Sequence, residues 1–290
     1  MRLSGRRTSS NVEDRRGRPS GRKVAGIGGV AGIIIVALLA WAKGGNPLEA
    51  ISGSGIDVLS MINPSQENYV PTEREEELAT FVSQILAGTE DVWTREFQKM
   101  GMEYEPPRLV MFTGSVNSGC GGATAATGPF YCSADKTVYI DLSFYEQMEN
   151  QLGASGDFAY AYVIAHEVGH HVQNLLGTLS QAHNYMAQVS EREANQMSVR
   201  LELQADFYAG IWAYNDNKLY NSLEPGDIEE GLNAASKIGD DYLQKQSQGY
   251  AVPDSFNHGR SDQRVKWLRL GATTGDVTLG DTFSPDYSAL

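Results

Sequence analysis

The chain has 290 residues, 41% of them hydrophobic and 20% charged, a composition that excludes a wholly disordered or fibrous protein. The formal net charge of −13 is uneven, because residues 1–43 hold nine Lys and Arg against two Asp and Glu, whereas residues 44–290 are strongly acidic. So acidic a body excludes nucleic-acid binding through a general phosphate-facing surface, and two cysteines exclude a disulfide scaffold and a four-cysteine zinc site.

Residues 1–23 form a basic N-terminal tail, and an uncharged apolar run follows over residues 24–42. At 1.5 Å per residue this run would span about 28 Å, close to the hydrocarbon thickness of a bilayer. We therefore expect a single-pass membrane protein with its N-terminus in the cytoplasm and its main domain in the periplasm or outside the cell. A cleaved signal peptide ending near Ala40 and Ala42, or a buried core helix, are the alternatives.

Residues 43–71 are rich in Gly, Ser, Asn and Pro, which predicts a linker before a domain over 72–290. Thr72 with Glu75 forms a capping box, so a helix should begin there, and Gly88 should separate it from a second helix over about 90–100. The pattern then predicts a strand at Arg108–Phe112, a β-hairpin made of Phe130–Cys132 and Thr137–Leu142, and helices at about 157–176, 187–215, 227–247 and 261–270. Strands before helices indicate a mostly helical α+β domain with a small sheet.

Cys120 and Cys132 flank a glycine-rich stretch at 114–128 that could shape a cleft. In an oxidising compartment we expect a disulfide between them, which would close a loop of about a dozen residues and contribute roughly 3 kcal/mol. Two free thiols are the alternative. A zinc-binding role for the pair is disfavoured, because no histidine lies near either cysteine in sequence.

The apolar helix predicted at 157–176 carries His166, Glu167 and His170. His166 and His170 are four residues apart, so their imidazoles project from one helix face at a spacing that suits tetrahedral Zn²⁺. Glu167 is rotated by about 100° and could take a proton from a metal-activated water without binding the metal. His171 should point away from the metal. Burying these groups without partners would be costly, so we expect one Zn²⁺ per chain.

A hydrolytic zinc site needs a third ligand and an open position. A histidine six residues after His170 is excluded because Leu176 stands there, and His183 lies in a polar connection. The better candidate is Glu202, with Asp206 four residues later on a helix face of small side chains. Glu202 would bind zinc and Asp206 would accept the Nδ1–H of a ligand histidine.

An ordinary solvated acid pair is the alternative interpretation of Glu202 and Asp206. Glu191 and Glu193 compete as ligands, but neither has an acid four residues later.

The pair His166-Glu-x-x-His170 with Glu202-x-x-x-Asp206 resembles the gluzincin arrangement of thermolysin-like peptidases. More narrowly, the chain resembles the predicted neutral zinc metallopeptidase family of bacterial single-pass membrane proteins. The resemblance is carried by segments such as AHEVGHHVQNLLG at 165–177, RLELQADFYAGIWA at 200–213 and NHGRSDQRVKWLRLG at 257–271. It implies a zincin-like fold, with His166, His170 and Glu202 as zinc ligands and Glu167 as catalytic base.

A peptidase also needs a donor for the oxyanion that forms at the cleaved carbonyl. His258, in a loop just before a helix, is our candidate, with Arg260, Tyr242 and Tyr250 as rivals and a surface or capping role as the alternative.

We therefore expect a membrane-anchored zinc peptidase that hydrolyses peptides or proteins outside the cytoplasm and binds no nucleic acid. The hairpin at 130–142 could offer an edge strand to an extended substrate. Two other hypotheses are a non-catalytic zinc-containing scaffold for envelope or unfolded proteins, and a zinc amidase acting on cell-wall peptides.

Overall fold

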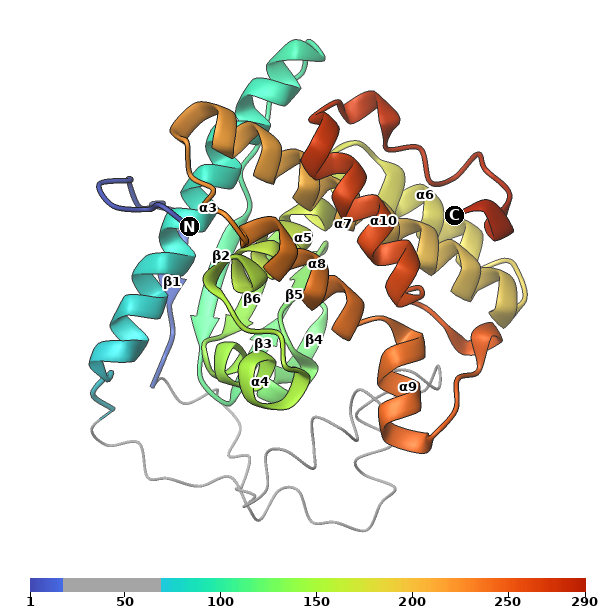
Figure 1. Ribbon diagram of the computed structural model, residues 1–290, viewed down its shortest axis with the longest axis horizontal. Helices are drawn as coiled ribbons and strands as arrows, with labels where there is room; N and C mark the ends of the chain where they lie inside the picture. Colours follow the sequence, from blue (N-terminus) through green and yellow to red (C-terminus); the bar gives the residue numbers. More distant parts are fainter. Residues whose placement is uncertain (18–68) are drawn as a thin grey trace.

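The computed structural model describes residues 1–17 and 69–290, in which helices surround a small mixed sheet (Figure 1). The sheet has the order β1-β2-β6-β5, made of Val12–Asp14, Arg108–Phe112, Thr137–Asp141 and Phe130–Cys132. β1 and β6 run parallel to β2, and β5 pairs antiparallel with β6 as a hairpin. A separate two-stranded ribbon joins β3 (Ser115–Ser118) to β4 (Gly121–Thr124). The predicted strand at Arg108–Phe112 and the predicted hairpin are confirmed.

The helices of the described ranges are, in chain order, α3 (Glu73–Lys99), α4 (Ser143–Leu152), α5 (Asp157–Leu175), α6 (Thr178–Met186), α7 (Glu191–Tyr220), α8 (Asp227–Lys237), α9 (Asp240–Gln248) and α10 (Ser261–Thr274). Short 3₁₀ turns occur at η2 (Ala125–Thr127), η3 (Pro253–Ser255), η4 (Val277–Leu279) and η5 (Tyr287–Ala289). In Figure 1, α3 lies beside the sheet and α10 crosses over α7 on the other side of the molecule.

Two helix boundaries differ from the sequence prediction for identifiable reasons. α3 begins at the predicted capping box of Thr72 but continues through Gly88, whose missing side chain makes room for neighbouring groups. A Cβ there would lie 2.6 Å from both Arg6 Nη2 and Asp216 Oδ1. The helix predicted at 227–247 is split at Gly239, where a Cβ would meet the backbone nitrogen of Ser261 at 2.4 Å. Both differences between predicted and observed helices therefore occur at a glycine that packs closely against a distant segment. Helices α4 and α6 were not predicted.

Three long helices pack with their backbones almost in contact. A Cβ on Gly169 of α5 would lie 2.9 Å from the carbonyl oxygen of Ala205 on α7. On the opposite side of α7, a Cβ on Gly210 would lie 2.3 Å from Leu268 O of α10, and one on Gly271 would lie 2.2 Å from Phe207 O. Glycine at these crossings lets α5, α7 and α10 approach closely. Polar side chains of neighbouring helices are thereby brought close to one another.

The N-terminal residues form part of the same body as the helices. Val12 of β1 lies opposite Leu109 of β2 in the sheet. The Arg6 guanidinium donates to both carboxylate oxygens of the fully buried Asp216, at 2.7 and 2.5 Å. Gly17 and Tyr69, which are both described residues, lie against each other. The basic residues before position 18 are therefore held against an acidic domain.

These contacts overturn the single-pass arrangement. One crossing of a bilayer would separate the N-terminal tail from the main domain, yet β1 and β2 share a sheet. Over residues 1–17 and 69–290, none of the helices combines the length and apolar character needed to span a bilayer. The expected span at 24–42 and most of the expected linker at 43–71 lie outside the described residues. The predicted fold class, with its N-terminal transmembrane helix, and the predicted localisation, with tail and domain on opposite sides, are therefore wrong, although the mixture of helices and a small sheet is present.

Cys120 and Cys132 form the predicted disulfide, with Cα atoms 5.8 Å apart. Cys120 lies in the turn between β3 and β4, and Cys132 is fully buried at the end of β5. The bond ties the exposed ribbon to the edge strand of the sheet.

Candidate metal centre

The α5 helix carries a short polar run inside an apolar surrounding. Its flanking residues Ile164, Val168 and Val172 are fully buried, so the helix lies within the core rather than on the surface. His166 and Glu167 are buried with them. Groups of this kind are tolerated in a core only when they have polar or ionic partners.

Glu202 of α7 meets the two histidines of α5. His166 Nε2 lies 3.2 Å from Glu202 Oε2, and His170 Nε2 lies 3.4 Å from Glu202 Oε1. One ligand atom from each residue can be chosen so that all three lie within 4.8 Å of one another. Ligands about 2.05 Å from a tetrahedral zinc ion are about 3.3 Å apart, so the spacing and the donor set fit zinc.

Asp206 fixes the orientation of His166. His166 Nδ1 lies 2.8 Å from Asp206 Oδ1 and donates to it, which leaves Nε2 directed toward Glu202. Asp206 is fully buried and also accepts hydrogen bonds from Tyr162 Oη at 2.6 Å and Arg264 Nε at 2.8 Å. The carboxylate therefore has a cationic partner of its own, and the predicted contact between Asp206 and a histidine is present.

The electrostatics of this cluster favour a cation. Burial opposes protonation of His166, but Asp206 and Glu202 outweigh it and raise its pKa to about 10. Burial likewise opposes ionisation of Glu202, yet His170 and His166 hold its pKa well below the usual range. The negative charges of Glu202 and Asp206 thus favour a positive charge beside the two histidines. Either a proton or a metal ion can supply that charge.

His170 is held by a neutral side chain that sequence reasoning missed. Its Nδ1 lies 2.9 Å from Gln173 Oε1 and donates to it. The Gln173 amide is itself fixed, because its Nε2 donates to Leu201 O at 2.7 Å and Gln204 Oε1 at 3.1 Å. A polar residue three positions after His170 in a buried helix was the available signal.

Glu167 lies beside β5 and is not among the three clustered ligand residues. Burial raises the pKa of its carboxyl, against the opposing charges of His166 and His170. The backbone N–H of Tyr131 donates to this carboxylate. The edge strand of the sheet therefore positions the expected base.

His171 points away from the cluster, as expected, and is fully buried. Its Nε2 donates to Glu105 O at 2.7 Å, and its Nδ1 accepts from Tyr131 Oη at 2.9 Å. Burial lowers the pKa of His171 to about 4. His183, the rival third ligand, is exposed on α6 and outside the cluster.

His258 lies in the buried loop before α10. Asp240 accepts from its backbone nitrogen at 2.7 Å and from its Nδ1 at 3.1 Å. His258 is close enough to Glu202 to contribute to the lowered pKa of that carboxyl.

The three rivals of His258 have different surroundings. Arg260 is paired with Asp262, Tyr242 accepts from Lys237 Nζ, and Tyr250 is 62% exposed.

Arg264 and Tyr162 are the main site residues that sequence reasoning missed. Arg264 is 3% exposed and binds Asp206 through Nε and Nη2. Its Nη2 also donates to Tyr162 Oη at 3.2 Å, which closes a three-residue network behind His166. No local pattern marks Arg264, since its partner lies 58 positions away on another helix.

Comparison with known proteins agrees with the chemistry of this centre. A family model described as "Putative neutral zinc metallopeptidase" matches residues 1–283. The chain is 48% identical over 290 residues to "Uncharacterized protein YpfJ" of Escherichia coli strain K12, covering 98% of this chain and 99% of that protein. It is 45% identical over 191 residues to "Uncharacterized protein Rv2575" of Mycobacterium tuberculosis strain H37Rv, covering 62% of this chain and 64% of that protein. No solved structure matches the chain, so the zincin-like fold implied by the resemblance is not shown. The protein therefore belongs to the neutral zinc metallopeptidase family.

Proposed function

We propose that the protein is a zinc-dependent peptidase in which His166, His170 and Glu202 hold one zinc ion and Glu167 is the catalytic base. The observation that carries the proposal is the convergence of three ligand atoms from two helices, with a buried carboxylate beside them that is not one of the three. A bound zinc ion supplies a Lewis acid that activates water and polarises a carbonyl. A purely structural site would use a fourth protein ligand and would have no use for Glu167.

Glu167 moves the proton in this proposal. Its carboxylate accepts a proton as water attacks the peptide carbonyl and passes it to the departing amine. Burial raises the pKa of Glu167, which makes the carboxylate a stronger base than an exposed one. The Tyr131 N–H holds the carboxylate in place. β5 lies at the edge of the described sheet, so an extended peptide substrate could pair with it. Such pairing would bring the peptide bond to be cleaved close to Glu167.

His258 is proposed to stabilise the oxyanion. Asp240 accepts one hydrogen bond from the His258 imidazole and one from its backbone nitrogen, and the ring lies near Glu202 rather than in solvent. A donor held in place before the reaction does not have to reorganise as charge develops on the carbonyl oxygen. We expect His258→Ala to lower kcat by about 10²-fold while zinc content is kept.

The test measures zinc content and cleavage of unfolded casein by the wild type, Glu167→Gln and a surface control, Glu149→Gln. We expect one zinc per chain in all three, cleavage by the wild type and the control, and loss of cleavage in Glu167→Gln or with a chelator. If all three hold zinc, none cleaves, and all bind casein alike, the non-catalytic scaffold is the correct function. If no zinc binds, both proposals fail.

A further inference from the structure

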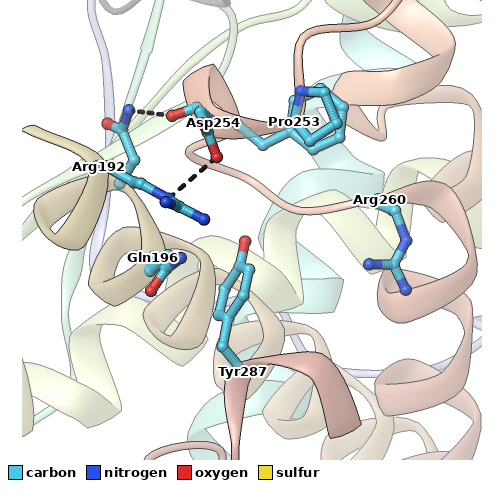
Figure 2. A pocket seen from close by; sticks show the side chains of 8 residues that line it. Arg192, Gln196, Pro253, Asp254, Arg260 and Tyr287 are labelled. Atoms are coloured by element: carbon cyan, nitrogen blue, oxygen red, sulfur yellow. Dashed lines mark hydrogen bonds and ion pairs between the residues drawn. The ribbon is translucent and has the colours of Figure 1, made fainter.

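A hollow lies along the helix that carries Glu202. It has a volume of about 190 Å³ and opens between the start of α7, the η3 turn and η5 (Figure 2). Eight residues line it: Arg192, Asn195, Gln196, Pro253, Asp254, Phe256, Arg260 and Tyr287. In Figure 2 the Tyr287 ring stands between Arg192 and Arg260. The volume suits one side chain or a chain end rather than a cofactor, since cofactor pockets are usually 300 Å³ or larger.

This pocket neighbours the metal centre. Asn195 and Glu202 are seven residues apart on α7, so they share a helix face and are separated by about 10 Å along the axis. The loop before α10 lies over the intervening turns, with Gly259 against Val199 and Leu203. His258 belongs to the same loop and sits between two pocket residues in sequence. A peptide in the extended conformation covers about 10 Å with three residues.

The pocket carries positive charge in an acidic protein. Two arginines line it against the single carboxylate of Asp254, although the chain has a net charge of −13. Arg192 pairs with Asp254 through Nε at 3.1 Å, and Asn195 Nδ2 donates to Asp254 O at 2.9 Å, which fixes the rim. Arg260 pairs with Asp262, which lies outside the lining.

The donor set suits a carboxylate. Each guanidinium has five N–H donors, so an ion pair with one carboxylate leaves donors for a second. Burial raises the pKa of Tyr287, so its phenol is neutral and can also donate. A cationic group would meet two arginines, and an apolar group would leave these polar groups without water.

We propose that this pocket binds a carboxylate of the peptide substrate, placed about three residues from the bond that is cleaved. The carboxylate belongs either to an acidic side chain or to the C-terminus of the peptide. This inference rests on the proposed peptidase function, which it refines by naming a substrate class.

Binding is measured separately from cleavage to test this. Zinc-loaded Glu167→Gln is titrated calorimetrically with eight-residue peptides of three kinds. In the first, one glutamate is moved through every position and the C-terminus is amidated. The second has glutamine in its place, and the third combines glutamine with a free C-terminus. We expect about tenfold tighter binding of a glutamate peptide at one position, or of the free-carboxylate peptide, than of the amidated glutamine peptide. The kind that binds more tightly identifies the source of the carboxylate.

Variants then assign the preference to the pocket. Adding Arg192→Gln or Arg260→Gln should reduce the ratio of affinities to about one. Arg269→Gln, an equal loss of charge at an exposed position of α10, should leave the ratio unchanged. Equal binding of all three peptide kinds, or a preference that survives both pocket substitutions, would overturn the proposal.

Cleavage of the same peptides by the wild type separates the two proposals. Cleavage without preference for a carboxylate refutes the pocket and leaves the peptidase. Preferential binding by Glu167→Gln, without cleavage by the wild type, refutes the peptidase and leaves the pocket as a carboxylate-binding site.

Discussion

Replacing Gly169 by alanine should weaken zinc binding through a backbone displacement. The added Cβ would lie 2.9 Å from Ala205 O, 3.1 Å from Ala205 Cα and 3.3 Å from Ala205 Cβ. Carbon atoms in contact prefer about 3.5–4.0 Å, so α7 must move away from α5 by about 0.5 Å. Because the first two clashing atoms are backbone, rotation of a side chain cannot relieve the contact. Glu202 lies one turn before Ala205 and would move with it, away from the histidines on α5.

The magnitude follows from the tolerance of metal sites. Zinc–ligand distances vary by only about 0.2 Å, so a shift of 0.5 Å should reduce zinc affinity by about 10–100-fold. The fold should lose less, because overpacking costs about 1–3 kcal/mol while alanine in place of glycine favours the helix by about 1 kcal/mol. Zinc affinity is measured by competition with a chelator, and stability by urea unfolding of the metal-free protein.

Gly231→Ala is the matched control. Its Cβ would meet Phe158 Cε1 at 2.6 Å, at the start of α5 and about 12 Å along the helix from His166. This variant should lose stability but keep zinc affinity. Wild-type zinc affinity in Gly169→Ala would refute the argument that close approach of α5 and α7 sets the ligand geometry.

Three further changes test the fold. Arg6→Met should cost about 3–5 kcal/mol of unfolding free energy in urea, because it leaves the fully buried Asp216 without its cation; a loss below 1 kcal/mol would contradict the structural role of the N-terminal residues. Reduction of the Cys120–Cys132 bond should lower stability by about 3 kcal/mol, measured with and without a reducing agent and compared with the double serine variant, which should not respond to the agent. Burial lowers the pKa of His171 to about 4, so as pH falls from about 6.5 to 4 the unfolded chain binds the proton first and about 3 kcal/mol of stability is lost. A His171→Phe variant should show a shallower decrease over this pH window, and parallel curves would show that His171 is not the group responsible.

Local spacing predicted the two pairs of candidate site residues because the members of each pair are close in sequence. His166 with His170, and Glu202 with Asp206, are each four residues apart on one helix, so helical geometry alone puts each pair on one face. The two pairs meet because Gly169 lets the two helices approach. The sequence shows that residue 169 is a glycine, but it does not show that Ala205 packs against it.

The N-terminal residues were misinterpreted for the opposite reason. Basic residues before an apolar run resemble the flank of a membrane span. In the structure, however, Arg6 pairs with Asp216, which lies 210 positions later in the chain. Arg16, whose side chain is 3% exposed, is held partly by Glu76, 60 positions away. Arg264 was missed in the same way, because a buried arginine has no sequence signature apart from its partner. Contacts of this kind are decided by tertiary packing, on which a single sequence carries no local signal.

Parallel pairing of β1 with β2 has a consequence for biosynthesis. Val12 leaves the ribosome 97 residues before its partner Leu109, and closing a loop of that length costs about 4 kcal/mol of chain entropy. The outer edge of β2 stays open until the early segment returns, and the Arg6 salt bridge must wait for the end of α7. The residues of β1 are thus translated early but fold late. A nascent chain that stalls before β1 pairs with β2 would expose an unpaired strand edge to other chains.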